Sequence, residues 1–336
     1  MTEVTNMKRK NKWNVWGFLL VIVLAAFLGS TTVYAAKLPA LKVKGTRLVN
    51  EKGKTVQLKG VSTHGLSWYP EYVNQKAFTH MKKKWGINVV RLAMYTSEYN
   101  GYCTGDDANR KALEKKIDQG VTYATKAGMY VIIDWHILSD GDPRLYEKQS
   151  VKFFKKMAAK YKNHANVIYE ICNEPNWGTS WEDIRTYANK VVKAIRSKDK
   201  KAVILIGTPT WSQDVDAAAQ HPLKGYKNLM YTLHFYAASH GDNLREKAQT
   251  ALEQGLPLFV SEFGISDASG SGGLNKAEGA KWMKFIKKHK ISYVGWSLSN
   301  KDESSALIKP SCKKKTGWTN GDLGDWGKWL LKQFRK

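Results

Sequence analysis

The chain has 336 residues, of which 43% are hydrophobic and 25% are charged, and this excludes a disordered or fibrous protein. The length suits one large domain or two ordinary ones, with a core that needs no metal or disulfide to hold it. The formal net charge of +25 indicates anionic neighbours such as nucleic acid, cell-wall polymers or lipid headgroups, unless it serves solubility alone.

The first 36 residues have the order of a secretory signal. Residues 8–12 are basic (KRKNK), residues 15–29 are apolar (VWGFLLVIVLAAFLG), and residues 30–36 (STTVYAA) end in small side chains. This order predicts a signal peptide over residues 1–36, cleaved near Ala36, and a secreted, extracellular protein. The apolar run is shorter than the roughly 20 residues of a spanning helix. An uncleaved anchor is the alternative, because the apolar stretch extends through Tyr34.

The remaining chain predicts a hairpin followed by repeated units of strand, loop and helix. Residues 41–60 alternate and turn at residues 50–53, which is typical of a β-hairpin. The strands that we expect lie at 56–65, 87–95, 129–136, 166–174, 202–207, 228–236, 257–264 and 291–300. The helices that we expect lie at 76–85, 110–127, 145–161, 181–197, 243–254, 276–289 and 326–334. Residues 208–227 have the weakest helical pattern.

The apolar runs alternate with helices, which indicates a parallel sheet covered by helices. Eight such units in about 280 residues fit a (β/α)8 barrel better than an open doubly wound sheet. No glycine-rich fingerprint follows the first strand, which disfavours a dinucleotide-binding fold. The sequence therefore predicts an α/β protein with one (β/α)8 TIM barrel over residues 37–336, preceded by a short N-terminal hairpin.

Polar and aromatic residues stand at the predicted strand ends, and a barrel brings these ends to one face, where chemistry takes place. In chain order they are His64 and Trp68, Arg91 and Tyr95, Trp135 and His136, Asn173 and Glu174, His234 and Tyr236, Glu262, and Trp296 with Asn300 and Lys301. Glu174 and Glu262 belong to the fourth and seventh strands. Retaining glycosidases need two carboxyl groups about 5–5.5 Å apart, one as acid and one as nucleophile. Arg91 and Tyr236 could hold one glutamate ionised while the other keeps its proton.

Each residue also has an ordinary explanation. A single strand-end glutamate is usually just solvated. Several other residues can be packing residues of the core or of loops: His64, His136, His234, Trp135 and Trp177. Arg91 is harder to explain in this way, because a buried guanidinium needs a partner. The two glutamates with aromatic neighbours favour a site.

The chain resembles endoglucanases of glycoside hydrolase family 5, in the branch of secreted bacterial cellulases. The matching stretches span residues 61–306 and read VSTHGLSWYP, GINVVRLAMY, VIIDWHIL, VIYEICNEPN, LHFYAASH, VSEFGIS and GWSLSNKDESSA. The Asn-Glu-Pro and the later Ser-Glu-Phe-Gly are specific together. The resemblance implies a (β/α)8 barrel that hydrolyses β-1,4-linked glucan with retention of configuration.

The resemblance also implies roles. Glu174 would be the acid and base, and Glu262 the nucleophile. Asn173 would bind the 2-hydroxyl of the sugar being cleaved, while Arg91 and Tyr236 would orient Glu262.

Further contacts with sugar follow from the same resemblance. His136 and His234 would line the cleft beside the glutamates, and Trp296 would stack at the subsite next to the scissile bond. Residues further along would be His64, Tyr95, Trp68, Lys301 and Glu303. We expect a monomer.

Two features depart from the family pattern. Residues 308–326 are unusually basic, and residues 1–36 hold four basic residues and one acidic residue, which leaves +22 for the rest. A neutral glucan does not require this charge, so a weak affinity for anionic cell-wall polymers stays open. We expect no nucleic-acid partner.

Two alternatives remain at this stage. A related barrel hydrolase could use the same glutamates on mannan, xyloglucan or mixed-linkage glucan. A non-catalytic binder of polyanions would need neither glutamate and would bind with strong salt dependence.

Metals and disulfides are weakly indicated. No metal motif appears, and residues 319–325 (TNGDLGD) lack the spacing of a calcium loop, so a turn is expected there. No organic cofactor is implied. Cys172 falls in a buried strand as a packed thiol, while Cys103 and Cys312 could pair.

Overall fold

The computed structural model describes residues 1–2 and 38–335. The predicted signal peptide, residues 1–36, lies outside the described residues except for its first two. Among the described residues, no helix combines the length and the apolar character needed to cross a membrane.

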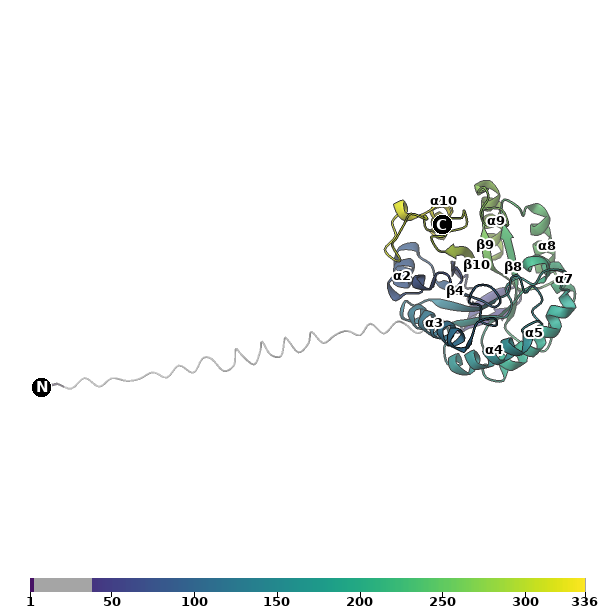
Figure 1. Ribbon diagram of the computed structural model, residues 1–336, viewed down its shortest axis with the longest axis horizontal. Helices are drawn as coiled ribbons and strands as arrows, with labels where there is room; N and C mark the ends of the chain where they lie inside the picture. Colours follow the sequence, from purple (N-terminus) through teal and green to yellow (C-terminus); the bar gives the residue numbers. More distant parts are fainter. Residues whose placement is uncertain (3–37, 336) are drawn as a thin grey trace. The chain divides into compact units, whose positions relative to one another are not determined.

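A closed barrel of eight parallel strands forms the centre of residues 38–335, in the order β10-β3-β4-β5-β6-β7-β8-β9 (Figure 1). The strands are β3 (Lys59–Thr63), β4 (Val89–Tyr95), β5 (Tyr130–His136), β6 (Val167–Glu170), β7 (Ile204–Ile206), β8 (Leu229–Tyr236), β9 (Leu258–Gly264) and β10 (Ser292–Leu298). Each lies within its predicted segment, so the predicted (β/α)8 fold is confirmed. Several strands end earlier than predicted, and the largest correction is at β6, which stops at Glu170 instead of Glu174 while the next residues continue as a loop.

The helices surround the strands (Figure 1). They are α2 (Gln75–His80), α3 (Asp107–Lys126), α4 (Glu147–Tyr161), α5 (Trp181–Arg196), α6 (Pro209–Ser212), α7 (Val215–Gln220), α8 (Asp242–Glu253), α9 (Lys276–His289) and α10 (Asp325–Arg335). Shorter turns are η1 (Pro70–Tyr72), the π-helical η2 (Met81–Trp85) and η3 (Asn320–Asp322). The weak pattern over 208–227 corresponds to α6 and α7, the shortest pair of consecutive α-helices.

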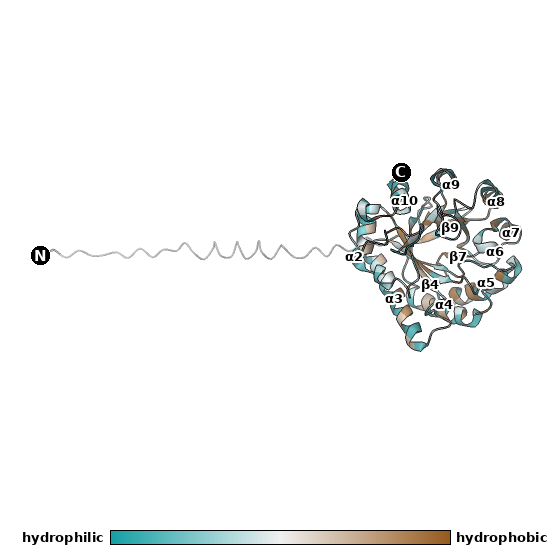
Figure 2. Ribbon diagram, turned by 45° about the horizontal axis from the view of Figure 1, so that its top comes forward, coloured by the Kyte–Doolittle hydropathy of each residue, from teal (hydrophilic) through white to brown (hydrophobic). Residues whose placement is uncertain are grey.

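Helix α5 illustrates how the local sequence sets these elements. The Ser180 side chain accepts a hydrogen bond from the backbone of Asp183, and the Asp183 side chain accepts one in return from the backbone of Ser180. This capping box satisfies backbone donors that the first helical turn leaves unpaired. Buried residues then recur at helical spacing, among them Ile184, Val191 and Ile195. The apolar stripe faces the barrel, and hydrophilic residues face outward on the surrounding helices (Figure 2).

The N-terminal hairpin exists, but its predicted turn was wrong. Strand β1 (Leu41–Lys44) pairs antiparallel with β2 (Arg47–Asn50) around Gly45 and Thr46. Gly45 has a φ of +56°, which glycine adopts readily. The Asn50 side chain instead accepts hydrogen bonds from the backbone of Lys52 and Lys54, which makes a second turn after the hairpin.

The hairpin covers the end of the barrel at which the strands begin. Leu41 and Leu48 belong to one buried apolar cluster with interior residues of the strands, such as Val89 and Ile132. The Tyr130 hydroxyl donates a hydrogen bond to the Pro39 carbonyl over 2.8 Å. This end is therefore closed by packed side chains, which leaves the opposite end for a site.

The structure shows the state of the three cysteines and the conformation of residues 319–325. Cys172 is buried as expected, and Cys103 and Cys312 are both free thiols, so the pairing that the sequence left open is absent. The 319–325 segment contains η3, where Thr319 and Asp322 form a capping box. This agrees with the expected turn.

Candidate active site

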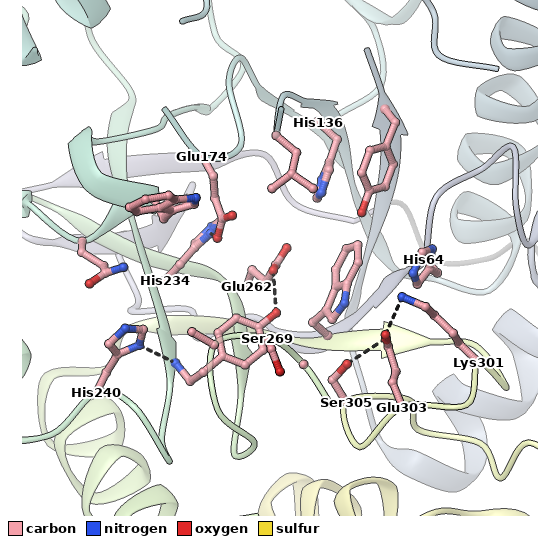
Figure 3. Close-up of a pocket in the computed structure, with 18 of the residues that line it drawn as sticks. His64, His136, Glu174, His234, His240, Glu262, Ser269, Lys301, Glu303 and Ser305 are labelled. Atoms are coloured by element: carbon pink, nitrogen blue, oxygen red, sulfur yellow. Dashed lines mark hydrogen bonds and ion pairs between the residues drawn. The ribbon is translucent and has the colours of Figure 1, made fainter. Parts of the chain in front are cut away.

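A cavity of about 580 Å³ opens where the barrel strands end. Figure 3 shows Glu174 beside His234, Glu262 at the centre, and Lys301 with Glu303 on the other side. Ten of the thirteen residues that the sequence proposed for the site line this cavity: His64, Tyr95, His136, Glu174, His234, Tyr236, Glu262, Trp296, Lys301 and Glu303.

The two glutamates come from different kinds of element. Glu262 lies on β9, whereas Glu174 lies in the loop four residues past the end of β6. The Asn176 side chain donates to the Glu174 carbonyl over 2.8 Å and fixes this loop. One oxygen of each glutamate and one nitrogen of His234 lie within 4.8 Å of one another. The carboxyl groups therefore face a common point in the cavity.

Arg91 is the charged centre beneath the cavity. It is fully buried on β4, and its Nη1 donates to Glu262 Oε2 over 2.9 Å. Its Nε and Nη2 donate to the two oxygens of Glu170 over 2.7 and 3.2 Å. Its Nη2 also lies 3.1 Å from Asp134 Oδ2 and 2.6 Å from Asn173 Oδ1. One cation thus faces three buried carboxyl groups, and this answers the expectation that Arg91 needs a partner.

One positive charge cannot balance three ionised carboxylates in a dry site. Burial raises the pKa of Asp134 to about 7, against the opposing effect of Arg91. Burial likewise raises the pKa of Glu170, again opposed by Arg91. The carboxylates in turn raise the pKa of Arg91 despite its burial. The cluster therefore binds protons more readily than isolated carboxylates do.

Glu262 is held at both oxygens. The Tyr236 hydroxyl donates to Oε1 over 2.8 Å, and Arg91 donates to Oε2 over 2.9 Å. Burial and then the charge of Glu174 raise the pKa of Glu262, while Arg91 lowers it. Burial and Glu262 raise the pKa of Tyr236 well above its ordinary value, so the phenol remains a donor. Both contacts stabilise the ionised carboxylate and fix its orientation.

Glu174 has a different environment. Its Oε1 lies 2.9 Å from His234 Nδ1, and Arg91 does not reach it with a hydrogen bond. Burial raises the pKa of Glu174 to about 8, and the nearby Asp134 and Glu170 add to this rise. Glu174 therefore carries a proton at neutral pH. Two carboxyl groups whose environments differ in this way are suited to different roles in acid–base catalysis.

The two histidines beside the glutamates are neutral. His136 Nδ1 lies 2.7 Å from Asp134 Oδ2, and its Nε2 lies 3.3 Å from the Asn173 amide nitrogen. Burial and then Arg91 lower the pKa of His136 to about 3. Burial lowers the pKa of His234 to about 4. Neither imidazole carries charge near neutral pH.

Aromatic rings form one wall of the cavity. Trp296 stacks on His136 with ring centroids 5.2 Å apart, and Tyr95 lies 4.1 Å from the same imidazole. The His64 ring lies 5.2 Å from Trp296, and burial and then Lys301 lower the pKa of His64 to about 3. Flat faces of this kind match the apolar faces of sugar rings.

Lys301 and Glu303 close the rim on the side of His64. Their charged groups lie 2.5 Å apart. The Ser305 hydroxyl also donates to Glu303 over 2.8 Å (Figure 3). Lys301 and Glu303 therefore line the cavity as an ion pair, in which each charge has a partner.

Three residues proposed from the sequence do not line the cavity. Arg91 and Asn173 are fully buried beneath it. Trp68 is 36% exposed and packs edge-on against Tyr95 with centroids 4.7 Å apart. It lies next to the aromatic wall rather than in it.

The sequence interpretation missed residues of two kinds. Asp134, Glu170 and Ser261 lie beneath the cavity with no exposed surface. The two carboxyl groups stand inside apolar strands, and the argument applied to Arg91 would have found them. Trp211 lines the cavity from the four-residue helix α6, and His240 lines it from the loop after β8. Neither position belongs to a periodic pattern in the sequence.

Trp135 and Trp177, for which the sequence allowed a packing role, differ in burial. Trp135 is fully buried against Phe153 and Phe154, which agrees with packing. Trp177 is 73% exposed, so the packing explanation is wrong for it. Its ring lies 5.3 Å from that of Trp211 at the cavity wall.

Glu174, His234 and Glu262 also have the spacing of a metal site. Carboxylate oxygens and imidazole nitrogens are common metal ligands. Both ring nitrogens of His234 are already engaged, at 2.9 Å to Glu174 and 2.8 Å to Ser261. A metal would have to break one of these contacts, so the donor set fits an acid–base pair better.

A barrel with two buried carboxyl groups at this separation, in an open cavity with an aromatic wall, defines a glycoside hydrolase.

Comparison with known proteins gives the family. The family model described as cellulase (glycosyl hydrolase family 5) matches residues 49–302. Endoglucanase A of Butyrivibrio fibrisolvens is 49% identical over 295 residues, which cover 88% of this chain and 68% of the relative. An endoglucanase of Clostridium saccharobutylicum is 44% identical over 327 residues, covering 95% and 72%. The chain belongs to glycosyl hydrolase family 5.

Solved structures agree with this assignment. Cellulase Cel5C_n superposes with a TM-score of 0.85 at 42% identity, covering 91% of this chain and 95% of that one. The catalytic domain of Thermobifida fusca endoglucanase Cel5A, in complex with cellotetraose, gives 0.83 at 33% identity, covering 88% and 97%.

Proposed function

We propose that the protein is a secreted endo-β-1,4-glucanase that retains configuration by double displacement. The separation of the two glutamates carries this proposal, because oxygens of Glu174 and Glu262 lie within 4.8 Å of each other. Retaining enzymes place their carboxyl groups about 5–5.5 Å apart, while inverting enzymes leave about 6.5–9.5 Å for a water molecule.

The first step forms a covalent glycosyl-enzyme. An oxygen of Glu262 attacks the anomeric carbon as the bond to the leaving oxygen breaks. The proton of Glu174 passes to that oxygen, so the departing chain leaves as an alcohol. The pKa of about 8 for Glu174 supports its role as the acid, since burial keeps the proton in place until transfer.

The second step returns the enzyme to its starting state. Glu174, now ionised, takes a proton from a water molecule, and the water oxygen attacks the anomeric carbon. The ester bond to Glu262 breaks and leaves its carboxylate with Arg91 and Tyr236 as donors. Two inversions at one carbon give net retention.

Asn173 is proposed to bind the 2-hydroxyl of the cleaved sugar. Its amide oxygen accepts from Arg91, and one amide hydrogen goes to the Ile137 carbonyl over 3.0 Å. The other faces His136 at 3.3 Å, a long contact that a sugar hydroxyl can replace.

The remaining proposed contacts follow the cavity wall. Trp296 stacks at the subsite next to the scissile bond, and His136 and His234 border the two glutamates. Sugars further along meet residues of the rim and the aromatic wall: His64, Tyr95, Trp68, Lys301 and Glu303.

The choice of β-1,4-glucan rests on relatives named endoglucanase and on the cellotetraose complex of one of them. The same glutamates would serve mannan, xyloglucan or mixed-linkage glucan. A panel of these polysaccharides with reducing-end detection separates them. Release from mannan alone, with none from carboxymethylcellulose, would overturn the cellulose assignment.

The deciding experiment combines two substrates, one for the mode of cutting and one for the stereochemistry. Viscosity and new reducing ends are measured together on carboxymethylcellulose, and proton NMR records the anomer released first from cellotetraose. Internal cutting predicts a fast fall in viscosity with few new ends, and retention predicts the β-anomer first. An initial α-anomer would contradict the double displacement.

The high positive charge supports a secondary proposal of weak affinity for anionic cell-wall polymers. It predicts retention on immobilised heparin that falls steeply with salt. Binding that persists while every glycan is left intact would favour the non-catalytic binder instead. The active form is proposed to be a monomer, which light scattering tests.

Export is proposed from the N-terminal sequence. Mass spectrometry of protein from the culture medium should give a chain that begins close to residue 37. A full-length chain found only with membranes would favour the uncleaved anchor.

A further inference from the structure

A second cavity, of about 580 Å³, lies beside the catalytic one on the side of Glu174. Residues of the loops after β5 and β6 and of the first turn of α5 line it: Ser139, Asp140, Gly141, Asp142, Arg144, Leu145, Trp177, Gly178, Thr179 and Asp183. We propose that this second cavity holds the leaving portion of a neutral β-glucan chain, with one of its sugars stacked on Trp177. The inference rests on the proposed function, because it extends the substrate of the same site.

Two loops connect the catalytic cavity to the second cavity. The loop after β6 lines the first with Glu174 and the second with Trp177. The loop after β5 does the same with Leu138 and Ser139, which are consecutive residues. The Trp177 ring lies 5.3 Å from the ring of Trp211, which is part of the catalytic cavity. An apolar path therefore leads from the point of cleavage to the second cavity.

This path leads away on the side of the leaving group. In the proposed mechanism Glu174 gives its proton to the leaving oxygen, so the departing sugars lie on its side of Glu262. Lys301 and Glu303 lie on the other side of Glu262 (Figure 3). Because the chain runs from Glu174 into Trp177 within three residues, the second cavity is placed to receive the departing end of the glucan.

Exposed apolar side chains gather along the same path. Within the described residues, and apart from the terminal Met1, four large hydrophobic side chains are exposed: Trp68, Tyr99, Leu145 and Trp177. The rings of Trp68 and Tyr99 lie 6.1 Å apart, next to the aromatic wall of the catalytic cavity. Leu145 and Trp177, which are 63% and 73% exposed, line the second cavity. Exposed apolar side chains that cluster in this way mark a binding surface, whereas single ones do not.

The backbone holds the Trp177 ring out toward solvent. Trp177 has a φ of +53°, a left-handed conformation that is uncommon for large side chains. The preceding Asn176 donates from its side-chain amide to the carbonyls of Leu138 and Glu174, each over 2.8 Å. Its backbone N–H donates to the Gly141 carbonyl over 3.0 Å, and a Cβ atom at Gly141 would clash with the Asn176 side chain. The two loops are thus fixed before substrate arrives, which limits the entropy lost on binding.

The polar groups of the second cavity suit a neutral chain. Arg144 donates from Nε to Asp142 Oδ1 over 3.0 Å and from Nη2 to Oδ2 over 2.7 Å, and it also contacts Asp183. All three side chains are partly exposed, so their remaining donors and acceptors can bind sugar hydroxyls. With Asp140, the cavity has three carboxyl groups and one guanidinium. It therefore disfavours the anionic polymers that the net charge of +25 would attract elsewhere on the protein.

Trp177→Asn tests the inference in kinetics. Asparagine tolerates the left-handed conformation and has no ring to stack, so the variant should fold. We expect KM for hydroxyethylcellulose, a neutral soluble polymer, to rise about five- to tenfold through the loss of one stacking contact, with kcat unchanged. A dinitrophenyl cellobioside, which has no sugar on the leaving side, should be cleaved with the wild-type kcat/KM. Trp177→Phe, which keeps a flat ring, should restore most of the affinity.

Trp329→Ala is the matched control. Trp329 is a partly buried tryptophan on α10 that packs on Trp326 with ring centroids 5.6 Å apart, and it lines neither cavity. Its loss should lower Tm without changing KM. An equal rise of KM in Trp329→Ala would overturn the inference. So would an unchanged KM in Trp177→Asn, or an equal loss on the dinitrophenyl cellobioside.

Carboxymethylcellulose tests the charge argument. It has the same backbone as hydroxyethylcellulose but carries anionic substituents, which the carboxyl groups of the second cavity repel. We therefore expect Trp177→Asn to raise KM for this polymer by less than about twofold. A larger rise on carboxymethylcellulose than on hydroxyethylcellulose would overturn the assignment of a neutral chain.

Binding without turnover separates this inference from the proposed function. Calorimetric titration with hydroxyethylcellulose, in the Glu262→Gln background, should give about five- to tenfold weaker binding when Trp177→Asn is added. If the wild type cleaves no glycan and Trp177→Asn still weakens binding, the proposed function alone fails. If the wild type cleaves with retention and Trp177→Asn leaves binding unchanged, the further inference alone fails.

Discussion

The hydroxyl of Tyr236 donates to Oε1 of Glu262 over 2.8 Å, on the side of the carboxylate away from Arg91. The two glutamates of the cavity therefore have different surroundings. Glu262 accepts hydrogen bonds from two fixed donors, whereas the carboxyl group of Glu174 contacts His234. This difference leads to separate expectations for each.

Tyr236→Phe should shift the acidic limb of kcat/KM. The hydrogen bond favours ionised Glu262, so its loss raises the pKa of that group, and the nucleophile ionises only at higher pH. We expect a rise of about one pH unit and a fall in kcat of roughly tenfold at pH 6. Tyr226→Phe, which removes a hydroxyl that donates to Asn189 on the surface, is the control. An unmoved acidic limb would show that Tyr236 does not tune Glu262.

Glu262→Gln should abolish hydrolysis of carboxymethylcellulose, by at least about 1,000-fold, because the amide is a poor nucleophile. Viscosity and reducing ends are followed beside the wild type. Glu253→Gln, an exposed position on α8, should keep full activity. Normal activity in Glu262→Gln would remove Glu262 from the mechanism.

Glu174→Gln should raise thermal stability at high pH. In the wild type the pKa of Glu174 is about 8 in the folded state, above its ordinary value of about 4.3. Its contribution to stability is therefore complete below about pH 4 and is lost as the pH rises through 8. Glutamine does not ionise, so Tm at pH 8.5 should exceed that of the wild type by at least about 2 °C, with no gain at pH 4.5. Calorimetry at both pH values checks this, and an equal gain at both would contradict it.

Arg91→Met should cost about 3–5 kcal/mol of unfolding free energy at pH 8, because three buried carboxyl groups lose their cation. Without Arg91 their folded pKa values rise further, so this loss should shrink toward pH 4.5, where protons replace the cation. Urea unfolding at both pH values measures the difference. Arg185→Met, which breaks an exposed ion pair with Glu182, should cost at most about 1 kcal/mol.

Reducing agents should leave the protein unchanged, since all three cysteines are free. Tm with and without dithiothreitol should agree, and a thiol reagent should titrate three groups after unfolding. A drop in Tm on reduction would reveal a Cys103–Cys312 bond.

The barrel could be predicted because each strand is a continuous apolar run with a helix after it. All eight strands lie within their expected segments, and Arg91 was identified because a guanidinium in such a run needs partners. The identities of those partners depend on how strands face each other across the barrel, which no local pattern reports. Glu170 was overlooked for this reason, although it stands in the same run as Glu174.

The loops were less predictable. The exposure of Trp177 and the place of Trp211 in the cavity wall depend on backbone conformations with positive φ, at +53° and +54°. Such conformations are uncommon for large side chains and have no periodic signal. The hairpin turn was misplaced because residues 45–46 and residues 50–53 both contain turn-forming residues, and only the packing on the barrel selects between them.

The hairpin of β1 and β2 has a consequence for engineering. It covers the end where the strands begin, whereas the cavity opens at the opposite end, where the strands finish. A shortened chain that starts after Asn50 would strip the cover from Val89, Ile132 and their neighbours, and would be prone to aggregate. A tag or surface tether joined ahead of Leu38, by contrast, attaches at the sealed end and leaves the mouth open to a polymer chain.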